Sequence, residues 1–315
     1  MATKTPFKSF IVAPLMLNSV LIIASMIFVF AFKNTTPVPI FMIFMLINTI
    51  FMTLYALVPL KYKNGFRLAN MLIIGSFLFF LAQLLGRQNF QIEGFFFYLF
   101  AGVIGGVIIN YANGKLIGPL ISGRSWCGWN CWTVMFLDLL PWKKNTTWQT
   151  SGIRYIKYIM FALSLALTAV LVLIFKYTIV DTSPEAMATG TKTALIWGAV
   201  GNILYYVIGI ALAVRFKDNR AFCKYACPVS LFLKASNKFA LLKIGTKKEK
   251  CTDCKTCSSV CPMSIDIPAY VKDGTRVLSD ECIMCMKCVA HCPENALFAS
   301  VGLDISKKNQ LIVIE

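Results

Sequence analysis

Long apolar stretches are the feature that most limits how this chain of 315 residues can fold. A helix needs about 20 apolar residues to cross a bilayer, and six stretches reach or nearly reach that length. They cover residues 10–32, 38–60, 69–86, 94–111, 155–180 and 193–215. Charged residues make up only 14% of the chain, whereas roughly a quarter is usual in soluble domains. Because only helices and closed barrels satisfy their backbone in lipid, the sequence predicts a membrane all-α fold with about six transmembrane helices.

The basic residues predict how these helices are oriented. The formal net charge is +17, and Lys and Arg concentrate before the first stretch, in every second loop and after the sixth. Lys61, Lys63 and Arg67, for example, lie in the predicted loop after the second stretch. Since Lys and Arg accumulate in cytoplasmic loops, we expect a multi-pass protein of the inner membrane with both termini in the cytoplasm. No nucleic-acid recognition motif accompanies the charge, so the expected surroundings are the lipid bilayer and not a nucleic acid.

The C-terminal cysteines form two runs with identical spacing. Residues 251–262 read CTDCKTCSSVCP, and residues 282–293 read CIMCMKCVAHCP. Both are C-x2-C-x2-C-x3-C-P, the spacing of bacterial two-cluster ferredoxins, in which the fourth Cys of each run ligates the other cluster. The predicted ligands are Cys251, Cys254, Cys257 and Cys292 for one 4Fe–4S cluster, and Cys282, Cys285, Cys288 and Cys261 for the second. Structural zinc sites also use C-x2-C pairs, but two such quartets that end in Cys-Pro fit zinc poorly.

The other four cysteines lie in an internal repeat. Residues 124–137 read RSWCGWNCWTVMFL, and residues 220–233 read RAFCKYACPVSLFL. Residues four apart share a face of a helix, and four thiolates complete a tetrahedral metal shell. We therefore predict one shared metal or iron–sulfur site, whose ligands are Cys127, Cys131, Cys223 and Cys227. The alternatives are buried inert thiols and two separate thiol pairs that act in disulfide exchange.

Other cofactors are not expected. The chain has a single histidine, His291, so it cannot by itself supply the two His ligands of a membrane b-type haem. It also lacks the C-x-x-C-H haem attachment motif, a Walker P-loop and the G-x-G-x-x-G dinucleotide motif.

This set of motifs resembles the membrane-bound polyferredoxin family. The resemblance rests on a membrane helix bundle, Arg-x-x-Cys-Gly-Trp-x-Cys at residues 124–131, Cys-x-Tyr-x-Cys-Pro at 223–228 and the two-cluster tail, and it covers residues 94–315. Members accompany periplasmic nitrate reduction, nitrous oxide reduction and cytochrome oxidase maturation. The resemblance implies membrane electron transfer, often with the quinone pool. The family usually has Cys-x3-Cys-Pro twice, whereas Trp132 follows the first pair here. The chain has no Ser/Asp-Gly-Ala-Thr flavin motif, so no covalent flavin is expected.

These patterns predict two domains. Residues 1–220 form a transmembrane helix bundle with the first cysteine pair. Residues 221–315 are cytoplasmic, and the second Cys-x3-Cys-Pro motif (221–244) precedes the ferredoxin-like domain (245–315). The predicted function is relay of single electrons between a cytoplasmic carrier or oxidoreductase and a membrane redox partner, with the quinone pool or another membrane redox subunit as candidates. An electron-transfer component is favoured over a stand-alone enzyme. The alternatives are a copper or iron reductase, an oxidase-maturation factor, and a redox sensor or scaffold.

A short basic run precedes the first cysteine quartet. It contains Lys247, Lys248 and Lys250. Opposite charge raises association rates at low salt, so this run can steer an acidic electron carrier towards the first cluster. Contact with anionic lipid headgroups explains the same residues equally well.

Overall fold

The computed structural model describes residues 37–104, 106–142, 152–181, 190–306 and 309–310, with isolated positions between 18 and 30. The first predicted span, 10–32, thus lies mostly outside the described residues. The chain forms two compact units, each assembled from segments that are far apart in sequence. The first unit takes Met1–Met71, Asn113–Asn130 and Leu233–Glu315, and the second takes Leu72–Ala112 and Cys131–Phe232. The predicted domain boundary after residue 220 stays a prediction.

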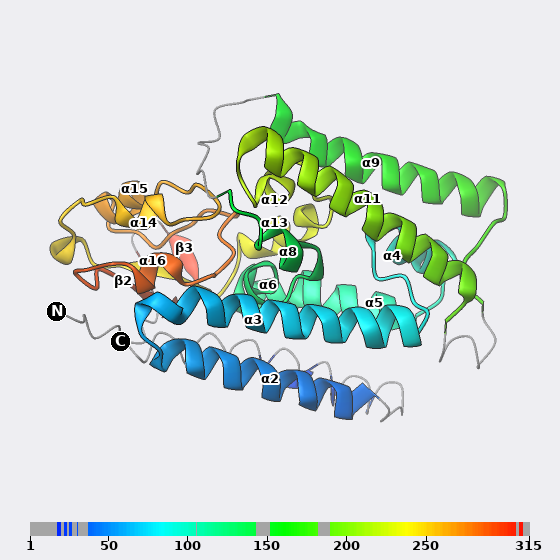
Figure 1. Cartoon of the computed structure of the whole chain (residues 1–315), viewed down its shortest axis with the longest axis horizontal. Coiled ribbons are helices and arrows are strands. Elements are labelled where there is room, and N and C mark those ends of the chain that lie inside the picture. The colour runs from blue at the N-terminus through cyan, green and yellow to red at the C-terminus, as the bar shows by residue number, and fades with distance from the viewer. Residues whose placement is uncertain are drawn as a thin grey trace. The chain divides into compact units, whose positions relative to one another are not determined.

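Three helices in the described part of the chain are long and apolar enough to cross a membrane (Figure 1). The first, Leu60–Leu85, comprises α3 (Leu60–Leu78) and the π-helical turns of η1 (Phe79–Leu85). The second, Ile156–Ile174, comprises α9 (Ile156–Ala169) and η4 (Val170–Ile174), and the third is α11 (Lys192–Phe216). A shorter apolar helix, Met42–Leu57, lies within α2 (Pro37–Leu57). The helical membrane character is confirmed, and the number of six spans stays a prediction.

The predicted span 94–111 is interrupted in the structure. Ile92–Phe100 form α4 and Gly106–Tyr111 form α5, and between them Gly102 has a φ of +68°. Glycine adopts this left-handed conformation without steric cost, and the helix therefore ends there instead of continuing. Neither α4 nor α5 has the roughly 20 residues that a bilayer crossing requires.

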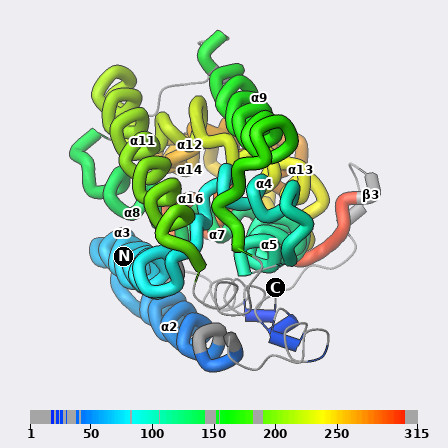
Figure 2. Tube along the Cα trace, turned by 90° about the vertical axis from the view of Figure 1, so that its right-hand side faces the viewer, coloured from blue at the N-terminus to red at the C-terminus, as the bar shows by residue number. Residues whose placement is uncertain are grey.

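The second unit is built around α11. This helix packs against α4, η1, α8 (Trp132–Leu137) and α12 (Ala221–Tyr225), and α4 also packs against α9. Figure 2 shows α8 and α12 beside α11. The N-terminus of α11 is capped by Thr191, whose hydroxyl oxygen accepts the N–H of Ala194 at 3.0 Å, which satisfies one of the free backbone donors. The remaining short elements of this unit are η3 (Ile153–Tyr155) and the first residues of α13 (Ser230–Asn237).

The first unit holds the ferredoxin-like part of the chain. Strand β1 (Leu242–Thr246) pairs antiparallel with β2 (Leu297–Val301), so the two ends of this part meet in one small sheet. Between the strands lie α14 (Thr256–Ser259), α15 (Ile267–Lys272) and α16 (Lys287–Ala290), with η5 (Lys248–Lys250) before them and β3 (Asp304–Ser306) and β4 (Asn309–Gln310) after. The same unit contains η2 (Ala112–Ile117), α6 (Gly118–Ser122) and α7 (Ser125–Trp129). Helix α6 packs against β1, and α2 runs alongside the first turns of α3 (Figures 1 and 2).

Candidate iron–sulfur sites

The two cysteine quartets have the same local backbone. In each quartet the residues just before and just after the second Cys have positive φ: Asp253 and Lys255 in the first, Met284 and Met286 in the second. Positive φ is uncommon outside glycine, and here it curls the backbone so tightly that amide groups turn towards the sulfurs. The N–H of Asp253, for example, donates to Sγ of Cys251 at 3.4 Å.

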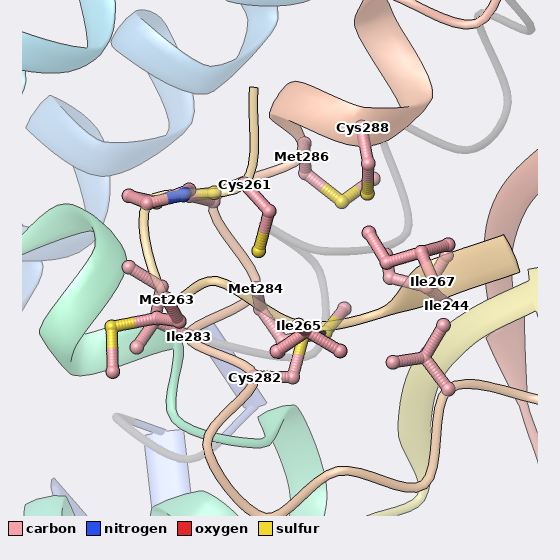
Figure 3. Close-up of a pocket in the computed structure, with 13 residues that line it drawn as sticks. Ile244, Cys261, Met263, Ile265, Ile267, Cys282, Ile283, Met284, Met286 and Cys288 are labelled. Carbon is pink, nitrogen blue, oxygen red and sulfur yellow. Dashed lines mark hydrogen bonds between the residues drawn. The ribbon is translucent and has the colours of Figure 1, made fainter. Parts of the chain in front are cut away.

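One pocket, which we call the inner pocket, is lined by cysteines from both quartets. These are Cys261 from the first quartet and Cys282, Cys285 and Cys288 from the second. Figure 3 shows Cys261, Cys282 and Cys288 around this space, together with apolar side chains such as Ile265 and Met286. Both Cys285 and Cys288 are buried. The inner pocket is therefore a shielded, apolar site with four thiols.

A second pocket, which we call the outer pocket, has the reciprocal composition. It is lined by Cys251, Cys254 and Cys257 from the first quartet and by Cys292 from the second. Its wall also contains polar residues such as Thr252, Lys255 and Glu294, and Cys254 is exposed to solvent. The outer pocket thus opens to the surface at the loop around Cys254.

The donor set of each pocket fits an iron–sulfur cluster. Four Cys thiolates are the usual ligands of a 4Fe–4S cluster, and each pocket supplies four. Within the described ranges, no three His, Cys, Asp or Glu side chains are arranged to hold a single metal ion. A cluster is larger than one ion, so its ligand sulfurs stand farther apart. When bound, each cluster takes up or releases one electron.

In each pocket, burial and the neighbouring thiols raise the pKa of at least one cysteine. Burial raises the pKa of Cys282 to about 12, and the nearby thiols of Cys285 and Cys261 contribute in the same direction. Burial likewise raises the pKa of Cys257 to about 11, with contributions from the other three thiols of the outer pocket. Burial therefore disfavours the thiolate forms of Cys257 and Cys282 when no cation is near. The positive charge of bound metal ions stabilises thiolates, which agrees with a metal-containing occupant.

The first copy of the repeat packs against the inner-pocket loop. Arg124 forms a buried ion pair with Glu281, the residue before Cys282, at 2.6 Å. The indole Nε1 of Trp129 donates to the carbonyl oxygen of Met284 at 2.9 Å. The sequence prediction did not identify these contacts. A difference between the two copies could have pointed to these contacts: the first copy reads Cys-Gly-Trp where the second reads Cys-Lys-Tyr.

The two cysteine pairs do not lie on continuous helices, contrary to the expected shared helix face. Cys127 lies in α7, whereas Cys131 has an extended ψ of 115° and precedes α8. Cys223 lies in α12, and Cys227 follows the end of that helix. In each copy, a break in the helix separates the two thiols. Cys127 belongs to the first unit and the other three to the second, so the shared site stays a prediction.

In the second unit, thiols from both copies lie near one guanidinium. Arg220 pairs with Asp138 at 2.6 Å, and both side chains are buried. Burial disfavours the charge on Arg220, but Asp138 and the thiols of Cys223 and Cys131 hold its pKa above the ordinary value. One cysteine of each copy is therefore within electrostatic range of the same cation. A cation favours thiolate formation, as a metal-binding or redox-active thiol requires.

Two models of 4Fe–4S protein families match the chain. A 4Fe–4S dicluster domain matches residues 243–293, which include all eight pocket cysteines. A 4Fe–4S binding domain matches residues 114–148 and 203–247, and each of these segments contains one cysteine pair.

Several curated proteins are similar over more than half of the chain. An uncharacterized protein of Methanocaldococcus jannaschii is 28% identical over 63% of this chain and 84% of its own length. The ferredoxin-type protein NapH of Haemophilus influenzae is 24% identical over 61% of this chain and 67% of its own length. The methylamine utilization ferredoxin-type protein MauN of Paracoccus denitrificans is 27% identical, over 52% and 57% respectively. No solved structure matches the chain significantly. The cysteine motifs and these matches together support a NapH-like family of polyferredoxins as the relatives of this chain.

Proposed function

We propose that this chain relays single electrons between a cytoplasmic carrier or oxidoreductase and a redox partner in the membrane. The observation that carries the proposal is the pair of four-thiol pockets with unequal exposure. The thiols of Cys288 in the inner pocket and Cys257 in the outer pocket interact electrostatically, so the pockets are neighbours. An exposed cluster next to a shielded one suits a relay, because electrons can enter at the surface and leave from the interior.

In this proposal each pocket binds one 4Fe–4S cluster with crossed ligands. The outer cluster takes Cys251, Cys254, Cys257 and Cys292, and the inner cluster takes Cys282, Cys285, Cys288 and Cys261. The protein supplies the position and the potential of each cluster. Cys254 of the outer pocket is exposed, whereas Cys261, Cys285 and Cys288 of the inner pocket are buried. Bound clusters would therefore differ in potential, since solvent exposure is one of the terms that set it.

The exposed side of the outer pocket is the proposed docking site for an acidic cytoplasmic carrier. Lys248, Lys250 and Lys255 are exposed and lie next to its cysteines in sequence. Lys247 is half-buried, and its ammonium group lies 5.2 Å from the centre of the Phe298 ring. The exposed lysines thus outnumber the exposed acidic residues Glu249 and Asp253 in the stretch 248–255 around Cys254, which favours a carrier with negative charge.

A third iron–sulfur centre at Cys127, Cys131, Cys223 and Cys227 completes the proposed relay. Support comes from the 4Fe–4S binding domain model, which matches both segments that carry these pairs. The electrostatic proximity of Cys131 and Cys223 to Arg220 agrees with thiols that act together.

A polar cluster in the second unit supports a partner with a polar headgroup, such as a quinone. Glu93 lies in the first turn of α4, and its Oε1 accepts a hydrogen bond from Ser164 at 2.7 Å. Among the described residues, its buried Oε2 has no hydrogen-bond partner. In the same unit, Asn202 of α11 donates to Gln83 at 2.7 Å. An ionisable side chain among apolar helices marks a functional site by default.

The test is a redox inventory of the full chain in detergent. We expect iron and acid-labile sulfide in equal amounts, with about eight iron atoms for the two ferredoxin-type clusters and more for a third centre. We also expect oxidation of an added quinol. Stoichiometric zinc without iron would overturn the proposal. Reduction of a copper salt without quinol oxidation would favour a metal reductase, and intact clusters with neither activity would favour a sensor.

The proposed orientation places both termini in the cytoplasm of a cell with an inner membrane. The basic loops support it. A reporter fused after Glu315 tests it, because a fusion that is active only on the outer side of the membrane would contradict this topology.

A further inference from the structure

Gly128 lies directly against the loop of the inner pocket. A methyl group at Gly128 would overlap the carbonyl oxygen of Ile283, and it would come within 3.4 Å of the amide nitrogen of Cys285. Only a residue without a side chain permits this approach. The backbone of the first repeat copy and the backbone between two inner-pocket cysteines are therefore in contact.

Trp129 extends this contact with its side chain. The ring is only 1% exposed, and its N–H donates to the carbonyl oxygen of Met284 at 2.9 Å. Met284 has a φ of 49°, a strained conformation for a residue with a side chain. The other side of the indole meets the ring of Tyr55 on α2, edge to face, at 5.1 Å between centres. The tryptophan thus fixes the turn that precedes Cys285.

Two side chains of helix α3 donate hydrogen bonds to the backbone of Gly128 and Trp129. Nη1 of Arg67 donates to the carbonyl oxygen of Gly128 at 2.8 Å, and Nδ2 of Asn70 donates to the carbonyl oxygen of Trp129 at 2.9 Å. Arg67 and Asn70 are fully or almost fully buried. Both belong to a helix that is long and apolar enough to cross a membrane. Gly128 and Trp129 therefore connect this helix to the inner-pocket loop.

The second repeat copy uses the equivalent positions differently. Lys224 replaces Gly128 and forms a buried ion pair with Asp218 at 2.6 Å. Tyr225 replaces Trp129 and packs on Phe216, with 5.0 Å between the ring centres. The contact with the inner pocket is thus a specific property of the first copy, and not a general consequence of the repeat.

We propose that Gly128 and Trp129 are the connection through which electrons pass between the inner cluster and the membrane part of the chain. Trp129 is a positioning residue that tunes the potential of the inner cluster by fixing the Met284 turn. The proposal rests on the proposed function and adds to it the path that the electrons take. With both groups bound, single electrons would pass between the inner pocket and a third centre whose predicted ligand Cys127 is bonded to Gly128. The indole itself is neither oxidised nor protonated.

The physical basis is the sensitivity of a cluster to its surroundings. Hydrogen bonds near the sulfurs and solvent access both set the potential, and the Met284 turn contributes to both for the inner cluster. The direct contact at Gly128 also removes any space between the two segments. Covalent bonds then lead from Gly128 to Cys127 without another gap.

The test compares Trp129→Phe with Trp126→Phe in the full chain in detergent. Trp129→Phe keeps a ring against Tyr55 but loses the N–H donor. Trp126 lies on the same short helix, but it stacks on Phe44 at 5.9 Å and under the ammonium group of Lys115 at 3.8 Å. The midpoint potentials of both ferredoxin-type clusters are followed by electron paramagnetic resonance during a redox titration, together with the iron content.

In Trp129→Phe we expect a shift in the midpoint potential of one cluster, with the other unchanged, and no shift in Trp126→Phe. Reduction of the third centre after addition of dithionite should also slow in Trp129→Phe. Selective loss of one cluster from Trp129→Phe supports the proposal as well. Unchanged midpoints and rates in Trp129→Phe would overturn it, as would equal effects in both variants. Absence of clusters from the unmodified chain would instead refute the proposed function.

Discussion

The indole N–H of Trp129 donates to the carbonyl oxygen of Met284 at 2.9 Å, and this bond joins the segment of Cys127 to the second cysteine quartet. Trp129 follows Cys127 by two residues, and Met284 lies between Cys282 and Cys285. Cys127 and the second quartet thus belong to the same unit, although they are more than 100 residues apart in sequence.

Gly128→Ala should remove the inner cluster selectively. The added methyl group overlaps the carbonyl oxygen of Ile283, and the loop must move away from the cluster position. We expect loss of about four of the eight iron atoms of the two ferredoxin-type clusters, measured as iron per chain. Gly65→Ala is the matched control, because nothing described lies within 4 Å of a methyl group there. Full iron content in Gly128→Ala would show that the contact is not required.

Crossed ligation predicts that Cys261→Ser damages the cluster of the other quartet. Cys261 belongs to the first quartet in sequence but lines the inner pocket. Its loss should therefore alter the inner cluster signal, while Cys254→Ser should alter the outer one. Electron paramagnetic resonance of the reduced protein distinguishes the two signals. The assignment is wrong if Cys261→Ser and Cys254→Ser affect the same cluster.

The grouping of the cysteines around two pockets was predictable from the sequence because spacing within a tight loop is a local property, whereas the ligand sets themselves stay a prediction. The quartets at 251–261 and 282–292 determine which sulfurs face one site, and the pocket linings agree with the crossed assignment. The number of spans was less predictable. Hydropathy alone does not register a single turn such as that at Gly102, which ends a helix within an apolar stretch.

Long-range contacts were not predictable from the sequence. Lys63 and Arg67 were interpreted as charges of a cytoplasmic loop, but α3 begins at Leu60 and includes both. Both are buried, Lys63 against the carbonyl oxygen of Ala56 and Arg67 against that of Gly128. A basic residue that binds a buried carbonyl group and one that faces cytoplasm look the same in sequence. Their difference is decided by the partner, which in the case of Arg67 lies 61 residues away.

Charge reversal at Lys248 and Lys250 should slow electron exchange with an acidic carrier such as a flavodoxin-like protein. Both side chains are exposed, so their effect is long-range and screened by salt, with a Debye length of about 10 Å at 0.1 M. We expect the rate of electron exchange to fall by about tenfold or more at low ionic strength, which is the order of magnitude of electrostatic steering. The decrease should be smaller at high ionic strength. Lys238→Glu is the control, because Lys238 is an exposed lysine directly after α13. If the rate is unchanged at both salt concentrations, the lysines serve lipid contact instead.

Asp304 should make the stability of the ferredoxin-like part depend on acid pH. Burial opposes its charge, but hydrogen bonds and ion pairs with Arg276 and Lys243 hold the pKa of Asp304 below its ordinary value. A carboxyl group with a lowered pKa stabilises the folded state above its unfolded pKa, near 3.9, and this stabilisation is lost as the pH falls through the lowered value. Asp304→Asn should cost roughly 1–3 kcal/mol at neutral pH and should weaken the acid dependence of thermal unfolding. Equal dependence in both proteins would contradict this role.

Glu93→Gln should separate the membrane-side reaction from the clusters. Oε1 of Glu93 accepts hydrogen bonds from Ser164 at 2.7 Å and from Tyr205 at 3.5 Å, so the side chain is held between α9 and α11. Glutamine keeps this shape, but it cannot accept a proton from a quinol at the second oxygen. We expect quinol oxidation to fall by about 10²-fold or more, the usual contribution of a positioned proton acceptor. Iron content and both midpoint potentials should remain unchanged. Asp181→Asn, at an exposed carboxylate of the same unit, serves as the control. Unchanged quinol oxidation in Glu93→Gln would exclude this carboxylate as the proton acceptor, and loss of clusters would show that its role is structural.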